Sequence, residues 1–310
     1  MKSRRIAFMP LVRTTFDVPF AHQMIDSARD SLQKAGFELV APPTAISDQS
    51  DAEEAARMLK TNTVDVLLIF QATFADSTLV TTLAEAAETP IFLWAVPEPW
   101  TGSRLRLNSL CGINLAAHAL TLREIKFEYG YGSPSEFQIL EKLSKIAEVG
   151  ALLRKLRSAR MGVVGEHPAG MDSCHLDEEQ LRDTFGIQVE KIALETVFDR
   201  VRSIESELVK PIREGLGKRL DNLSGLNQHA TNGTLKVYLA LRELADELDL
   251  DGLAVRCWPE FFTEMGCAAC GAMSMLSDGF DDQMFIPCSC EADINGTITQ
   301  WILQSLSESP

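Results

Sequence analysis

Two acidic side chains follow predicted strands in the second half of the chain. Glu260 comes just after an apolar run that ends at Trp258, and Asp293 comes after one that ends at Cys288. Glu291 is a third candidate, two residues before Asp293. One strand–helix–strand passage separates the two acids, so their strands can be neighbours and the carboxylates can face one crevice. Such carboxylates can bind a hard divalent cation through oxygen, or exchange protons with a substrate.

Each acid also has a simpler explanation. Asp293 precedes a predicted helix that begins at Ile294, and an Asp in that position can serve only to cap the helix. Glu260 can be a surface group that follows Pro259, which stiffens the exit from the strand. Spacing alone does not decide between the chemical and the structural interpretation, so both stay open.

Strands and helices alternate along the whole chain. Short apolar runs predict strands at 5–12, 38–41, 64–70, 90–96, 160–165, 188–192, 253–258 and 284–288. Helical spacing predicts helices at 20–35, 51–60, 77–87, 135–159, 176–185, 195–216, 231–248, 267–276 and 294–305. Strands separated by helices imply right-handed crossovers and parallel sheets. The predicted fold class is therefore α/β, with two doubly wound parallel-sheet (Rossmann-like) domains that carry helices on both faces.

The length of 310 residues fits two domains, at roughly 150 residues per domain. The long helix predicted at 135–159 lies between the two series of strands. We therefore predict an N-terminal α/β domain at residues 1–158 and a second α/β domain at residues 159–310. The second domain carries the acidic motifs.

Composition and charge exclude several classes of function. With 29 Lys and Arg against 44 Asp and Glu, the net charge is −15, which argues against nucleic acid and an anionic membrane surface as partners. The apolar runs are strand-sized, far short of the ~20 residues that cross a membrane. The first run contains Pro10 and ends at Arg13 without a cleavage site, so it is predicted to be a strand and not a signal peptide. An odd number of cysteines, seven, fits reduced thiols and a cytoplasmic location.

Four thiols lie close together in the sequence, as the pairs Cys267/Cys270 and Cys288/Cys290. Two such pairs can form a four-cysteine zinc site. The alternative is that they pack as small hydrophobic residues, since the first pair opens an apolar helix and Cys288 ends a strand. His167 follows a predicted strand and either lines the crevice between the two predicted domains or is an ordinary loop histidine.

Several segments resemble a known family. The stretch 256–260 (RCWPE) and the block 288–296 (CSCEADING) resemble the metal-site region of the L-fucose isomerase and L-arabinose isomerase superfamily, and most closely its fucose-isomerase-like branch. The segments 109–118 and 162–172 resemble the same branch. The resemblance extends over nearly the whole chain.

This resemblance implies an aldose–ketose isomerase that acts on a pentose or deoxyhexose through a cis-enediol. In that family, two acidic residues and a histidine hold a divalent metal ion, usually Mn²⁺, which acts as a Lewis acid on two adjacent sugar oxygens. Carried over by position, Glu260 and Asp293 are the metal ligands and the acid/base pair, with Glu291 as the alternative ligand. Arg13 matches an arginine that contacts the substrate.

One departure from the family pattern bears on the expected function. Family chains continue into a C-terminal domain that supplies the histidine ligand, and we predict that this domain is absent from the present chain. None of the five histidines lies in the matching region. The expected partners are a small sugar and further copies of the chain in a homo-oligomer. The alternatives to an isomerase are a catalytically impaired, truncated paralogue and a module that binds a small polyol.

Overall fold

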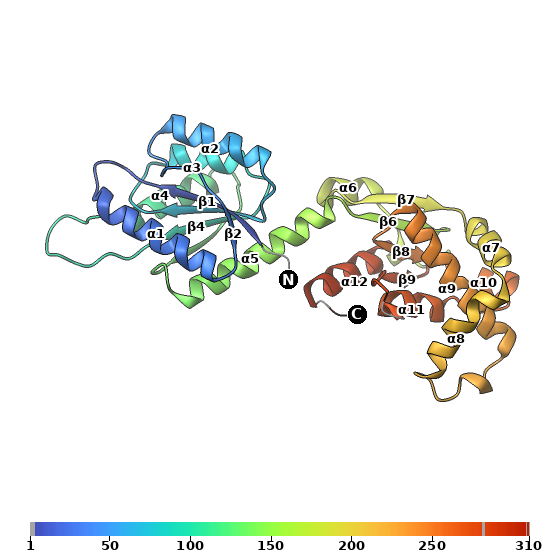
Figure 1. The fold of residues 1–310 in the computed structure, drawn as a ribbon. Coiled ribbons are helices and arrows are strands. Elements are labelled where there is room, and N and C mark those ends of the chain that lie inside the picture. Colours follow the sequence, from blue (N-terminus) through green and yellow to red (C-terminus); the bar gives the residue numbers. More distant parts are fainter. Residues whose placement is uncertain (1–3, 281–282, 308, 310) are drawn as a thin grey trace. The chain divides into compact units, whose positions relative to one another are not determined.

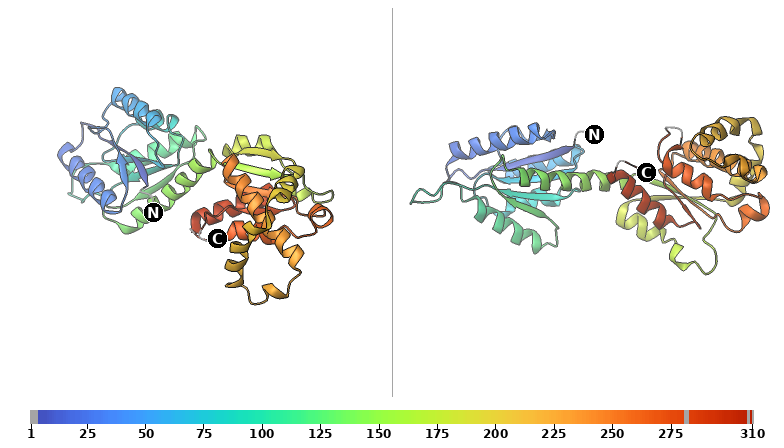
Figure 2. Two further views of the ribbon diagram at one scale, coloured as in Figure 1. Left: turned by 45° about the vertical axis from the view of Figure 1, so that its right-hand side comes forward. Right: turned by 90° about the horizontal axis from the view of Figure 1, so that it is seen from below.

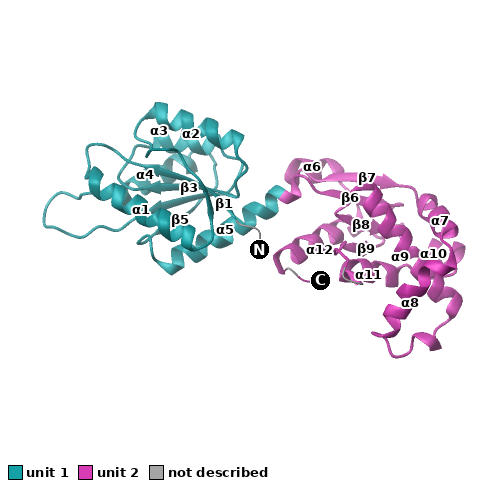
Figure 3. Cartoon of the chain, in the orientation of Figure 1, with its two compact units in different colours: residues 1–154 teal, residues 155–310 magenta. Residues whose placement is uncertain are grey.

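The structure is a computed structural model that describes residues 4–280, 283–307 and 309. The chain divides into two compact units, unit 1 at residues 1–154 and unit 2 at residues 155–310 (Figure 3). Our predicted boundary, after residue 158, lies a few residues further along the chain. Each unit contains one parallel sheet flanked by helices (Figure 1), which confirms the predicted α/β fold class.

Unit 1 contains five parallel strands in the order β2-β1-β3-β4-β5. The strands are β1 (Arg5–Leu11), β2 (Glu38–Val40), β3 (Val66–Gln71), β4 (Ile91–Ala95) and β5 (Glu128–Tyr131). The helices are α1 (Val18–Lys34), α2 (Gln49–Thr61), α3 (Ser77–Glu85), α4 (Ser109–Thr121) and α5 (Phe137–Leu156). One apolar cluster joins the sheet to α2, α3 and α4, and a second joins it to α1 and α5, so helices cover both faces (Figure 2).

Unit 2 contains four parallel strands in the order β7-β6-β8-β9. The strands are β6 (Arg160–Val164), β7 (Gln188–Ile192), β8 (Gly252–Val255) and β9 (Cys288–Cys290). The α-helices are α6 (Glu178–Phe185), α7 (Leu194–Ser203), α8 (Lys210–Gly217), α9 (Gln228–Leu248), α10 (Glu260–Glu264), α11 (Cys270–Asp278) and α12 (Ile294–Ser307). Short 3₁₀ turns lie at Asp172–Cys174, Ser206–Val209 and Leu223–Gly225. No helix within the described ranges is both long and apolar enough to span a membrane.

Several elements of the structure differ from the predicted ones. Strand β5 and helix α4 are missing from the predicted series. The helix predicted at 195–216 is interrupted between α7 and α8, because Pro211 lacks an N–H group and opens a new helix in its first turn. The strand predicted at 284–288 begins only at Cys288, after Pro287, which cannot donate to a strand ladder. The short helix α10 was not predicted, and Glu260 is its first residue.

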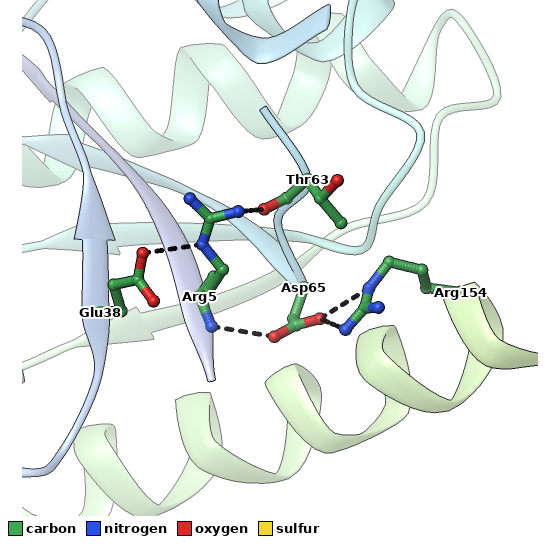
Figure 4. Close-up of polar contacts among 5 residues, drawn as sticks. All are labelled: Arg5, Glu38, Thr63, Asp65 and Arg154. Carbon is green, nitrogen blue, oxygen red and sulfur yellow. Dashed lines mark hydrogen bonds and ion pairs between the residues drawn. The ribbon is translucent and has the colours of Figure 1, made fainter. Parts of the chain in front are cut away.

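A buried carboxylate connects α5 to the sheet of unit 1 (Figure 4). Asp65 is only 2% exposed, and its two oxygens accept hydrogen bonds from separate parts of the unit. The backbone N–H of Arg5 donates to Oδ2 at 2.9 Å, while Nε and Nη2 of Arg154 donate to Oδ1 at 3.1 and 2.8 Å. The side chain of Arg5 in turn donates to Glu38 and to the carbonyl of Thr63. A buried charge is tolerated when it is paired and hydrogen-bonded in this way.

Gly150 allows α5 to approach the start of β3, and we expect Gly150→Ala to destabilise the protein. A Cβ at this position would lie 1.7 Å from the backbone oxygen of Asp65, so the helix would have to move. The free energy of unfolding should fall by about 3 kcal/mol, the upper end of the cost of overpacking. Chemical denaturation measures this change. Gly217→Ala is the matched control, because its Cβ meets nothing within 4 Å, and equal stability of the two variants would contradict the close packing.

Candidate active site

The carboxyl ends of β6, β8 and β9 lie next to one another at one edge of the sheet in unit 2. Strand order places β8 between the other two, and Val255 pairs with Cys290. Arg256, the first residue after β8, connects this edge to β6. Its backbone N–H donates to the carbonyl of Val164 at 2.9 Å, and its Nη1 donates to the carbonyl of Glu166 at 3.3 Å. The loops that follow these three strands therefore converge.

A cavity of about 380 Å³ opens at this edge, beside the ends of β6 and β7. His167, His175, Lys191 and Ala292 are among its lining residues. The two imidazole rings are nearly perpendicular, with centroids 5.7 Å apart, and Lys191 forms an ion pair with Glu178, whose hydrogen bond raises the pKa of Lys191. The volume suits a small ligand such as a monosaccharide. His167 thus lines a cavity whose lining residues all belong to unit 2. Its predicted place in a crevice between the two units stays a prediction.

The turn after β9 has an unusual backbone. Glu291 and Ala292 both have positive φ angles, 56° and 54°, in the left-handed region that costs residues other than glycine roughly 1–2 kcal/mol each. The turn is held by a hydrogen bond from the N–H of Asp293 to the carbonyl of Cys290, at 3.0 Å. Residues in such conformations cluster at functional sites, because the surrounding structure must enforce them.

This turn brings Glu291 back to β8. The thiol of Cys257 donates to Oε1 of Glu291 at 3.2 Å. The other carboxylate oxygen, Oε2, is buried and has no hydrogen-bond partner among the described residues. A buried acceptor left unpaired costs about 1–3 kcal/mol, and in native proteins such atoms need an explanation such as a catalytic role or a bound ion. Burial, followed by the hydrogen bond to Glu291, raises the pKa of the Cys257 thiol, so the thiol is protonated and can donate.

Glu260 has a different environment, because Arg256 occupies both of its oxygens. Nε of Arg256 donates to Oε2 at 2.9 Å, and Nη2 lies 2.6 Å from Oε1. Burial alone would raise the pKa of Glu260, but the arginine hydrogen bond and charge outweigh it, and the pKa is lowered. Glu260 is therefore ionised and neutralised by Arg256, which competes with a further cation for the carboxylate.

Asp293 caps α12. Its Oδ1 accepts a hydrogen bond from the N–H of Gly296 at 3.0 Å, three residues further on, and the hydroxyl of Ser289 donates to its carbonyl. The predicted capping role is thus confirmed. Asp293 also lines a cavity of about 800 Å³ together with Cys270 and Cys290. Whether it has a chemical role as well stays a prediction.

The structure groups a different set of metal-binding side chains from the predicted one. Among the described residues, one group of three potential metal ligands has donor atoms that all lie within 4.8 Å of one another. It consists of Cys257, Cys290 and Glu291. Glu260 and Asp293 are not in that group. Two sulfurs and one oxygen suit a softer cation than Mn²⁺, which prefers oxygen ligands. These three residues therefore do not fit the ion that the resemblance implies, and no Mn²⁺-dependent step is derived from them.

The four-cysteine zinc site is not among the groups found in the described residues. Cys267 and Cys288 are buried in the apolar core of unit 2, as expected of small hydrophobic residues.

Sequence reasoning missed Cys257, although it lies inside the quoted 256–260 stretch, two residues after β8. Its position at a strand end was the available signal.

Arg13 lies in unit 1, just after β1, whereas the three acids lie in unit 2. Its backbone N–H donates to the hydroxyl of Thr73 at 2.7 Å. Its guanidinium group lies over the ring of Phe74, 5.7 Å from the centroid, and 3.9 Å from the carboxylate of Asp76. The side chain is 45% exposed. Contact between Arg13 and a substrate stays a prediction.

Two comparisons with known proteins agree on one family. The family described as fucose/sulfoquinovose isomerase, N-terminal domain, matches residues 8–157. A sulfoquinovose isomerase of Priestia megaterium is 30% identical over 309 residues, which are 99% of this chain and 68% of the relative. That of Alkalicoccus urumqiensis is 30% identical over 303 residues, 97% of this chain and 66% of the relative. Among solved structures, the chain matches a periplasmic solute binding protein of an ABC transporter from Actinobacillus succinogenes 130z, which has D-allose bound. The match covers 99% of this chain and 93% of that protein, at 9% identity and a TM-score of 0.25.

We expect Asp293→Ala to lower the free energy of unfolding by about 1 kcal/mol, since alanine cannot cap α12. Asp293→Asn should change stability little, because asparagine caps as well as aspartate does. Thermal or chemical denaturation measures both changes. The control is Asp177→Ala, which removes the equivalent bond to the N–H of Gln180 at the start of α6. A loss in Asp293→Asn as large as that in Asp293→Ala would show that the charge itself, and not the cap, stabilises the fold.

Proposed function

Because the chain belongs to the fucose/sulfoquinovose isomerase family, we propose that it is an aldose–ketose isomerase acting on a small sugar. The first candidate substrate is sulfoquinovose, a 6-deoxyhexose that carries a sulfonate, since the curated relatives bear that name. Pentoses and other deoxyhexoses are the further candidates. The 30% identity over 309 residues supports this proposal, and so does the cavity of monosaccharide size beside the strand ends.

Aldose–ketose isomerisation moves one proton between two neighbouring carbons. A base removes the proton from C2 of the open-chain aldose, which gives an enediol. A proton is then delivered to C1, while the hydroxyl hydrogen on O2 is lost and one is gained on O1. The protein must therefore offer a carboxylate or imidazole within hydrogen-bond reach of the substrate, shielded from bulk water.

The observation that carries the assignment is the position of Glu291. Its Oε2 is buried and has no donor among the described side chains and backbone. The next residue, Ala292, lines the 380 Å³ cavity. Oε1 is fixed by Cys257, which orients the carboxylate. We propose that Glu291 is the base that accepts the proton from the sugar.

Glu260 and Asp293 remain the further candidates for the acid/base pair and for the ligands of a divalent cation such as Mn²⁺. At Glu260, Arg256 competes with the cation for the carboxylate. No step of the proposed proton transfer depends on that cation. A homo-oligomer, which the family resemblance implies, and a cytoplasmic location, which the seven cysteines fit, complete the proposal.

We expect Glu291→Gln to lower kcat/KM by at least about 100-fold, the usual loss when a positioned base is removed. Conversion of aldose to ketose is followed by NMR with sulfoquinovose, L-fucose and pentoses, with and without added Mn²⁺. Glu264→Gln is the matched control, because Glu264 is an exposed glutamate on α10, and its activity should equal that of the unaltered chain. Glu260→Gln and Asp293→Asn, compared in the same assay, report on the other two acids.

Two results would count against this function. Full activity in Glu291→Gln would show that another group accepts the proton. Saturable sugar binding without turnover in the unaltered chain, under all metal conditions, would favour a small-polyol binding module or a catalytically impaired paralogue.

A further inference from the structure

We propose that Cys257, Cys290 and Glu291 form a binding site for a thiophilic divalent cation of the Zn²⁺ class. The site is distinct in donor chemistry from the oxygen-rich manganese site that the family resemblance implies. Its argument is one of geometry and ligand type. It shares Glu291 with the proposed function, so an ion held by Oε2 and proton transfer to that oxygen exclude each other.

The distances between the donor atoms suit a tetrahedral ion. Bonds of about 2.3 Å to sulfur, at a tetrahedral angle, place two thiolates roughly 3.8 Å apart. In this structure the two sulfurs and a carboxylate oxygen lie within 4.8 Å of one another, and Cys257 Sγ is 3.2 Å from Glu291 Oε1. Small side-chain rotations therefore close the group around an ion.

The backbone holds these donors in place before any ion arrives. Cys257 lies two residues after β8, Cys290 is the last residue of β9, and Val255 and Cys290 are paired across the two strands. The left-handed turn at Glu291 and Ala292 directs the third donor towards the first. Ligands on the ends of paired strands lose less freedom on binding than ligands on mobile loops.

A second observation points to a missing partner at this position. Oε2 of Glu291 is buried, yet no group in the described residues donates to it. A carboxylate with one oxygen held by a thiol and the other unpaired is suited to ligate a cation. When the ion binds, the thiol protons of Cys257 and Cys290 are released to solvent, and the hydrogen bond between Cys257 and Glu291 is replaced by two bonds to the ion.

The donor set also determines which ions are preferred. Thiolates favour Zn²⁺, Co²⁺ and Cd²⁺ over Mn²⁺ and Mg²⁺, which prefer carboxylates, carbonyls and water. Three protein ligands leave the fourth position of a tetrahedral ion open to water or to a ligand oxygen. Cys290 is exposed and lines the cavity of about 800 Å³, which provides a route of entry from solvent.

The test is a Co²⁺ titration of the full chain after treatment with a chelator, under reducing conditions. We expect a cobalt–thiolate charge-transfer band, which Zn²⁺ removes at one equivalent and which the same concentration of Mn²⁺ leaves unchanged. Cys290→Ser should abolish the band, and Glu291→Gln should weaken Zn²⁺ binding by at least about tenfold, the lower end of the loss for a perturbed metal site. Cys111→Ser, an exposed thiol of unit 1, is the control and should keep the band.

The proposal is overturned if the unaltered chain shows no thiolate band, if Mn²⁺ displaces Co²⁺ as readily as Zn²⁺ does, or if Cys290→Ser retains the band. Because Cys257 is buried and its substitution can disturb folding, the exposed Cys290 carries the decisive comparison. None of these readouts depends on turnover. An active isomerase without the band leaves the proposed function intact, and an inactive chain that shows the band leaves the metal site intact.

Discussion

The parallel pairing of β6, β8 and β9 is the constraint on which the candidate site depends. Parallel strands all leave a sheet at the same edge, so the residues that follow them meet although they are far apart in sequence. The pairing of Val255 with Cys290 places Cys257 beside Glu291. The same parallel arrangement brings Arg256 to the carbonyl of Glu166. A shift of this register by one residue would move these side chains to the opposite faces of the sheet and separate them.

The three acids at this edge differ because their neighbours differ. Arg256 neutralises Glu260, the first turn of α12 occupies one oxygen of Asp293, and Glu291 keeps one oxygen buried and unpaired. The same functional group thus forms a salt bridge at Glu260, caps a helix at Asp293 and is an unpaired acceptor at Glu291.

The sequence predicted the layers well and the pairings within the site less well. Continuous apolar runs such as 64–70 and 90–96 identify strands buried on both faces, and the order of strands and helices then specifies parallel sheets. The three acids do occupy the region after β8 and β9. The hydrogen-bond partners of these acids could not be predicted from the sequence. Neither glutamate nor alanine is a residue type that indicates a positive φ angle, yet both Glu291 and Ala292 have one. Without that turn, the contact between Glu291 and Cys257 cannot be inferred, and the cysteine looks like an ordinary core residue.

The network around Asp65 sets a minimum length for any isolated version of unit 1. Arg154, which supplies both side-chain donors to the buried carboxylate, is the last residue of that unit. A fragment that extends through the end of α5 keeps every one of these partners. A fragment cut at Gly150 leaves the acid enclosed without its counter-charge, which is strongly destabilising for a buried ion. An isolated unit 1 therefore needs the end of α5 as well as its five strands.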